Sequence, residues 1–146
     1  TLYRAGTPAV GLVAAAELAL RQAYRQFDAR LAAVQEKNCV LREFFAGLPD
    51  VTINSPADAV PHILNISVDG VRGAQLQRAL DARGVCVSVK SACSAENTPS
   101  RAVFAVRRSR RAALSSLRIS LSHLTTQAEL EAFMEIFTDC CREMRQ

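Results

Sequence analysis

The stretch VCVSVKSACSAENTP, residues 85–99, decides the fold and holds the residue around which the rest of the sequence is interpreted. Val85, Val87 and Val89 stand at alternate positions, which is typical of a strand with one apolar face. The chain then becomes small and polar around Cys93, and Pro99 ends the extended run. An isolated cysteine is often a small core hydrophobe, but these polar neighbours predict a loop that presents the thiol of Cys93.

The residues before this stretch predict one long helix from Thr7 to about Leu48. Thr7 followed by Pro8 has the form of a helix cap with proline in the first turn. Apolar residues then recur at steps of three and four, which predicts one buried stripe: Leu20, Tyr24, Phe27, Leu31, Val34, Leu41, and Phe44 or Phe45. Such a helix would be about 60 Å long, so we expect it to run between two bodies or to bend near Lys37 and Asn38.

The remaining chain predicts short strands alternating with helices. Strands are expected at 51–54, 62–68, 85–89 and 117–121, and helices at about 72–83, after Ser100, and from the capping box of Thr126 and Glu129 onward. Short strands of this number predict an α+β fold, with a three- to four-stranded sheet and helices packed on one face.

Composition and charge exclude several classes of protein. The chain has 146 residues, 49% hydrophobic and 22% charged, which suits a soluble globular domain. No apolar run approaches the roughly 18 residues of a membrane span. The net charge of +4 comes from 18 basic residues, all arginine except Lys37 and Lys90. We expect no membrane and no nucleic acid as partners, and interpret the Arg107–Arg111 cluster either as a solvated loop or as a docking point for an acidic protein.

The cysteines and histidines indicate free thiols and no metal site. Five cysteines are present without any Cys-x-x-Cys spacing, and His62 and His123 have no metal-ligand spacing. We expect reduced thiols in an intracellular protein. The chain begins with Thr rather than Met, which predicts a piece of a longer polypeptide or a trimmed one.

Four motifs together resemble a known family. They are RAGTP at 4–8, PHILNIS at 61–67, SACS at 91–94 followed by PS at 99–100, and SLRIS at 116–120. In this order they resemble the C-terminal part of cysteine desulfurases, which are pyridoxal-phosphate (PLP) enzymes of the class V aminotransferase group. The resemblance implies the small C-terminal domain of a fold-type I PLP-dependent transferase. Residues 1–48 would be the end of the large domain and a long connecting helix, and residues 49–146 the small domain with the cysteine loop.

The resemblance also implies roles for three residues. Cys93 would take sulfur from L-cysteine as a persulfide, release L-alanine, and pass the sulfur to an acceptor or iron–sulfur scaffold protein; Lys90 nearby favours the thiolate. Arg118 would hold the substrate carboxylate as a bidentate partner, or else be a surface arginine paired with a helix acid. Thr7 would reach the PLP phosphate of the other subunit in a homodimer, or else only cap its helix.

The sequence departs from the family in ways that limit the isolated chain. Neither Lys37 nor Lys90 has the surroundings of the lysine that holds PLP, so we expect this chain to be inactive alone. Lys90 also stands where a glycine usually precedes the motif at 91–94. We expect a cytoplasmic protein. The alternatives are a sulfur-relay module without PLP, a selenocysteine lyase-like relative, and a nucleic-acid-binding domain that uses Arg107–Arg111.

Overall fold

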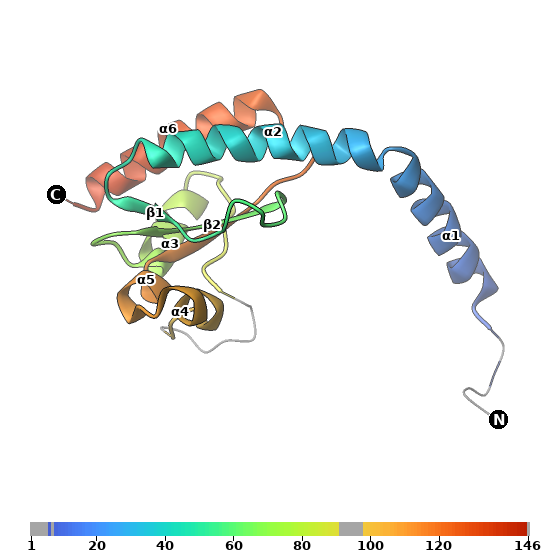
Figure 1. The fold of residues 1–146 in the computed structure, drawn as a ribbon, viewed down its shortest axis with the longest axis horizontal. Coiled ribbons are helices and arrows are strands. Elements are labelled where there is room, and N and C mark those ends of the chain that lie inside the picture. Colours follow the sequence, from blue (N-terminus) through green and yellow to red (C-terminus); the bar gives the residue numbers. More distant parts are fainter. Residues whose placement is uncertain (1–5, 7, 91–97, 146) are drawn as a thin grey trace.

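The computed structural model describes residue 6 and residues 8–90 and 98–145. A small antiparallel sheet lies between two groups of helices, and the first helix extends away from this body (Figure 1). In chain order the elements are α1 (Val10–Arg25), α2 (Phe27–Ala46), β1 (Val51–Ile53), β2 (Ile63–Val68), α3 (Gly73–Asp81), α4 (Arg101–Arg107), α5 (Arg110–Leu114), β3 (Ser116–Ser120) and α6 (Gln127–Glu143).

The sheet has the order β1-β2-β3, and its two faces differ in polarity. In the pairing of β2 with β3, Leu64 lies opposite Ile119 and Ile66 opposite Leu117, and all four are buried. The alternate pair, Asn65 and Arg118, lies on the other face because successive strand residues point to opposite sides. The predicted alternation of the 117–121 strand is therefore confirmed.

The apolar face of the sheet is covered by α2, α3 and α6. These helices and the strands form one core, in which Val34, Leu41, Leu76 and Leu80 are fully buried. Four phenylalanines join α2 to α6: Phe44, Phe45, Phe133 and Phe137, with ring centroids 5.1 to 6.3 Å apart. The predicted capping box at the start of α6 is also confirmed, because Thr126 and Glu129 exchange both of its hydrogen bonds.

The opposite face is partly covered by α4 and α5, where the sequence had predicted helices on one face only. The hydroxyl of Ser67 donates to the carbonyl of Ala112 at 2.8 Å, and that of Ser116 to the carbonyl of Ala113 at 3.3 Å. Small polar side chains satisfied by the helix backbone thus take the place of an apolar contact. The serines before these helices cap them: Ser100 accepts from the Val103 amide, as predicted, and Ser109 from the Ala112 amide.

The prediction of one helix from Thr7 to Leu48 is wrong in two respects. The helix begins at Val10 after Ala9, so the capping role of Thr7 is not supported. It is interrupted at Gln26, which has a φ of −117° and a ψ of 10°, and the chain changes direction there (Figure 1). No bend occurs near Lys37 and Asn38, which lie inside α2.

The apolar stripe is buried only in the second of the two helices. Within α1 no residue is buried, and Leu20 and Tyr24 are 58% and 77% exposed. Apolar residues recur at steps of three and four in both helices, but only α2 lies against the sheet, where it buries Val34, Leu41 and Phe45. None of the described helices is long and apolar enough to cross a membrane.

The predicted strand at 85–89 is reduced to a single bridge. Ser88 and Arg118 exchange two backbone hydrogen bonds, of 3.0 and 2.5 Å, and no ladder extends from them. The amide of Val85 donates instead to the carbonyl of Leu80 at 2.9 Å, which holds the start of this segment against the end of α3. The three valines nevertheless pack against the core, as their alternation predicted.

One glycine determines how closely α3 approaches the sheet. A Cβ atom on Gly73 would lie 2.5 Å from the carbonyl oxygen of Ser116. The start of α3 therefore packs directly on the backbone of β3, and only glycine allows this distance. This contact helps to fix the β3 register, which sets the position of Arg118.

Candidate functional site

Arg118 is displayed on the polar face of β3, where the sequence predicted it. Its side chain is exposed, and one Nη donates to the hydroxyl of Ser88 at 3.2 Å. No carboxylate of the described residues lies within ion-pair distance of it. The alternative of a surface arginine paired with a helix acid thus finds no support in this part of the chain.

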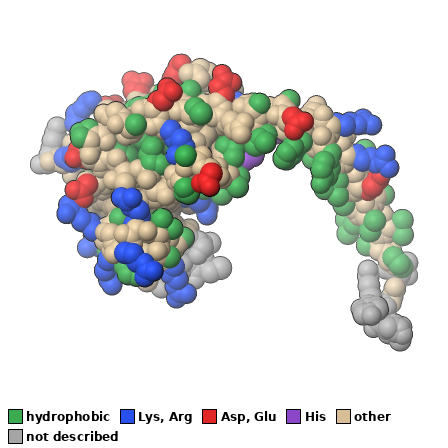
Figure 2. Space-filling view, in the orientation of Figure 1, with side chains coloured by type: hydrophobic (Ala, Val, Ile, Leu, Met, Phe, Trp, Pro, Cys, Tyr) green, Lys and Arg blue, Asp and Glu red, His purple; other side chains and the backbone are tan. Residues whose placement is uncertain are grey.

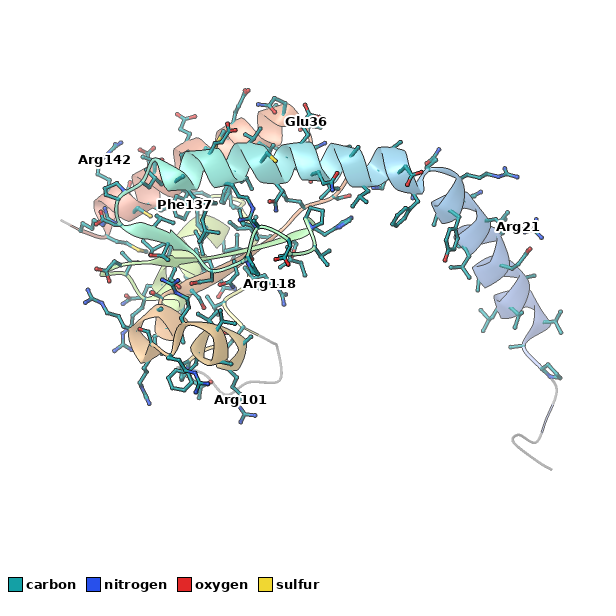
Figure 3. All side chains as sticks on the ribbon, in the orientation of Figure 1. Arg21, Glu36, Arg101, Arg118, Phe137 and Arg142 are labelled. Carbon is teal, nitrogen blue, oxygen red and sulfur yellow. The ribbon has the colours of Figure 1, made fainter. Side chains whose placement is uncertain are left out.

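Arg118 lines a groove of about 960 Å³ between the sheet, the turn after β1, and α4. Figure 3 shows its position below the sheet and above α4. The lining residues come from five separate segments of the chain: Asn54, Ser55 and Pro56; Ile63 and Asn65; Val89 and Lys90; Thr98 to Val103 with Val106; and Arg118 itself on β3. The volume falls in the range of small-molecule sites, which are about 300–1,000 Å³.

The wall formed by the turn after β1 is fixed by amide hydrogen bonds. The Asn54 carboxamide donates to Asn65 Oδ1 at 2.8 Å and to Ser67 Oγ at 2.7 Å, and Ser55 Oγ accepts from the Asn65 amide at 2.9 Å. Asn65 also stands opposite Arg118 in the strand register. The sequence predicted a structural role for Asn65, and these bonds agree with it.

A second set of hydrogen bonds ties the same turn to α2. The Arg42 guanidinium donates to the carbonyls of Ser55 and Pro56 at 3.2 and 2.8 Å and to Asn38 Oδ1 at 2.7 Å. Asn38 in turn donates to the carbonyl of Pro61 at 2.9 Å. The sequence analysis missed Asn38, Arg42 and Asn54; the one available signal was an asparagine on the apolar side of α2.

Two of the three predicted site residues, Cys93 and Thr7, lie outside the described residues. The residues on either side of the 91–97 segment are described, and both line the groove. Lys90 Nζ donates to Thr98 Oγ1 at 3.2 Å. Lys90 and Thr98 therefore lie side by side at the groove.

The residues of the groove do not by themselves fit PLP. Among the described residues that line it there is no carboxylate for the pyridine nitrogen and no aromatic ring to stack on the cofactor. Of the two lysines in the sequence, Lys37 donates to the carbonyl of Ala33 at 3.1 Å on α2, away from the groove. What the groove offers is cationic: Lys90, Arg101 and Arg118, a set suited to holding a carboxylate.

The described cysteines separate into exposed and buried pairs, all of them free thiols. Cys39 and Cys86 are exposed, and Cys140 and Cys141 are buried. Burial raises the pKa of Cys140, and it raises that of Cys141 to about 11, so both remain protonated thiols at neutral pH. Buried thiols of this kind are inert. Within the described ranges no three His, Cys, Asp or Glu residues are grouped to hold a metal ion.

Comparison with known proteins places the whole chain among class V aminotransferases and their relatives. The family "Aminotransferase class-V" matches residues 1–133. The chain is 33% identical to a cysteine desulfurase of Cereibacter sphaeroides, over 98% of this chain and 37% of that protein. It is 34% identical to the cysteine desulfurase IscS of Anaeromyxobacter sp. (strain Fw109-5), over 99% of this chain and 36% of that protein.

The fold comparison agrees with the sequence comparison. The NifS-like protein from Rickettsia africae ESF-5 superposes with a TM-score of 0.78 and 25% identity, over 94% of this chain and 36% of that one. The predicted α+β fold, that of the small domain of fold-type I PLP enzymes, is confirmed. The chain spans little more than a third of the length of the relatives that it matches. Because the family match covers residues 1–133, the chain belongs to the aminotransferase class-V family.

Proposed function

We propose that this chain is the C-terminal part of a PLP-dependent cysteine desulfurase, with Cys93 as the sulfur acceptor and Arg118 as the carboxylate ligand. The observation that carries the proposal is the placement of Arg118 in the groove that Lys90 and Thr98 also line. Cys93 is three residues from Lys90, and three extended residues span at most about 11 Å. A substrate held at Arg118 is thus near the segment that carries the thiol. The names of the similar proteins support the same activity.

The proposed roles follow from the chemistry of the two side chains. The Arg118 guanidinium is a planar donor, suited to bidentate hydrogen bonding with the α-carboxylate of L-cysteine. The Cys93 thiolate attacks the substrate sulfur; an S–S bond forms as the C–S bond breaks, and the carbon takes up a proton to give L-alanine. The product on the protein is a Cys93 persulfide, whose outer sulfur passes to a thiol of an acceptor or iron–sulfur scaffold protein.

The cofactor and the assembly belong to the same proposal. The lysine that carries PLP and the residues around its ring would lie outside this chain, since the described groove does not fit the cofactor. Thr7 would contact its phosphate across a homodimer, as the family resemblance implies. Residues 1–48 would be the end of the large domain and the connecting helix, and residues 49–146 the small domain with the cysteine loop. A cytoplasmic location suits the exposed free thiols of Cys39 and Cys86.

The test uses the complete polypeptide as its source produces it, and compares Cys93→Ser, Arg118→Lys and the control Cys86→Ser. We expect the wild type to contain PLP and to form alanine from L-cysteine, and Cys93 to become heavier by one sulfur atom. Cys93→Ser abolishes the persulfide and the turnover, whereas Cys86→Ser, which changes an exposed cysteine seven positions earlier, retains both.

Arg118→Lys has a separate expected signature. A lysine keeps the charge but loses the bidentate geometry, so KM for L-cysteine rises about 10- to 100-fold, the equivalent of one charge-assisted hydrogen bond. A source polypeptide without PLP, or full activity in Cys93→Ser, would contradict the proposal; a colourless chain of this length would favour sulfur relay instead.

A further inference from the structure

The outward surface of α4, the turn that follows it and the start of α5 combine arginines with exposed apolar side chains. We define the α4 surface as Arg101, Arg107, Arg108 and Arg110 together with Phe104 and Val106. All six are exposed, and Phe104 and Val106 are 45% and 69% accessible. Figure 2 shows Lys and Arg side chains gathered over α4 and α5. The predicted solvated loop at 107–111 is instead the end of α4, a cap in the left-handed region at Arg108 (φ 52°), and the start of α5.

The positive charge of this surface is not neutralised within the described part of the chain. Residues 101–111 contain five arginines and no acidic residue. Arg111 is paired with Asp69 at 2.8 Å, but no other arginine of this segment has a carboxylate of the described residues within ion-pair distance. Like charges held on two short helices repel one another, so an acidic partner would relieve a repulsion that the fold itself leaves in place.

The apolar side chains between the arginines indicate what kind of anion fits. Arginine and aromatic residues are the types enriched at the centres of protein–protein interfaces. Guanidinium groups match carboxylates in a bidentate geometry. Phe104 stands three positions from both Arg101 and Arg107 on α4, so it offers an apolar contact between them. Single-stranded nucleic acid is bound by several stacked aromatic rings, whereas the α4 surface has one. The chemistry therefore favours an acidic polypeptide over a nucleic acid.

We propose that the α4 surface binds an acidic polypeptide segment of a partner protein, which places an apolar side chain on Phe104. Arg101 and Val106 line the groove as well as this surface. A segment bound there lies at the mouth of the groove that contains Arg118. The inference does not depend on the sulfur chemistry, because it rests only on the charge and exposure of the α4 surface.

The experiment measures binding of labelled probes to the full chain by fluorescence anisotropy. The probes are a glutamate peptide interrupted by leucines, an all-glutamate peptide of equal charge, and an oligothymidylate of equal charge. We expect the glutamate–leucine peptide to bind most tightly and to weaken as salt rises. Replacing Arg101, Arg107 and Arg110 by alanine should raise its Kd about tenfold, since three ion pairs of 0.2–1 kcal/mol are lost.

The control variant removes the same charge elsewhere. Arg25, Arg78 and Arg142 are exposed arginines on α1, α3 and α6, and replacing them by alanine should change the Kd less than about twofold. Phe104→Ala should bring the glutamate–leucine peptide to the Kd of the all-glutamate peptide while leaving the latter unchanged. Circular dichroism checks that each variant is folded, and the salt titration of the wild type needs no variant.

Three outcomes would overturn the proposal: no measurable binding of the glutamate–leucine peptide, equal losses in the two triple variants, or tighter binding of the oligothymidylate. None of these measurements involves PLP or L-cysteine. Failure of the docking surface is therefore distinguishable from failure of the proposed desulfurase activity.

Discussion

The thiol of Cys141 shows how a single buried side chain makes the free energy of unfolding depend on pH. It lies in the last turns of α6, close to the turn between α2 and β1, and is 7% exposed. Loss of contact with water raises its pKa from 9.0 to about 11, with smaller contributions from Cys140 and Asp50 against the opposing effect of Arg145. The folded chain thus holds a proton that the unfolded chain releases at a lower pH.

This difference predicts that the free energy of unfolding falls as pH rises from about 9 to 11. An acid whose pKa is higher in the folded state contributes its full stability below the unfolded pKa and loses it as pH passes the folded pKa. Two pKa units correspond to roughly 2–3 kcal/mol. Urea unfolding at a series of pH values should show this slope in the wild type and a shallower one in Cys141→Ala.

The matched control for that series is Cys39→Ala. Cys39 is an exposed cysteine on α2, so its removal should leave the slope of the wild type unchanged. Some slope is expected to remain in Cys141→Ala, because burial also raises the pKa of Cys140. Identical slopes in the wild type and Cys141→Ala would show that Cys141 is not the group responsible.

At the scale of elements, the turn that borders the groove is held by side chains of α2. Asn38 is 5% exposed, and its carboxamide joins the carbonyl of Pro61 to the guanidinium of Arg42. Arg42 extends this connection to the carbonyls of Ser55 and Pro56. The helix therefore determines the position of a groove wall that it does not itself line.

Asn38→Ala is predicted to destabilise the domain by about 1–3 kcal/mol, because it leaves the Pro61 carbonyl and Arg42 without their buried partner. Equilibrium urea unfolding measures the loss. Amide hydrogen exchange of residues 54–63 should become faster in the same variant, since the wall loses its link to α2. Cys39→Ala, at the neighbouring exposed position, should alter neither quantity. Unchanged exchange in Asn38→Ala would show that the hydrogen bonds of Asn38 do not hold this wall in place.

The elements that the sequence predicted well are those decided by local pattern. The alternation around Arg118, the cap at Ser100 and the capping box at Thr126 depend on neighbouring residues, and all were found. The loss of the 85–89 strand depends on a contact with a distant part of the chain, the bridge between Ser88 and Arg118. The break at Gln26 follows from no pattern in the neighbouring sequence. The groove likewise joins Asn54, Arg101 and Arg118, which no sequence spacing brings together.

At the scale of the whole molecule, the chain divides into a packed body and an extended arm. Among the residues that the structure describes, all buried side chains of the core lie between positions 34 and 141, and α1 contributes none of them (Figure 1). The arm carries four exposed apolar residues, Val13, Leu18, Leu20 and Tyr24. They surround its one described ion pair, Glu17–Arg21. Its helical periodicity is as clear as that of α2, so periodicity alone did not distinguish the helix that packs from the one that does not.

Two leucines test this division directly, because they occupy the two consecutive helices and differ in burial. Leu20 is 58% exposed on α1, and Leu41 is fully buried on α2. Leu41→Ala should lower the free energy of unfolding of the chain by about 2–5 kcal/mol, through lost transfer energy and a cavity. Leu20→Ala should change it by less than about 0.5 kcal/mol, as for other exposed positions. Equal losses in the two variants would mean that α1 packs on the body in solution. A small loss in Leu20→Ala together with a large loss in Leu41→Ala would mean that the apolar face of α1 is free to pack against another part of the protein.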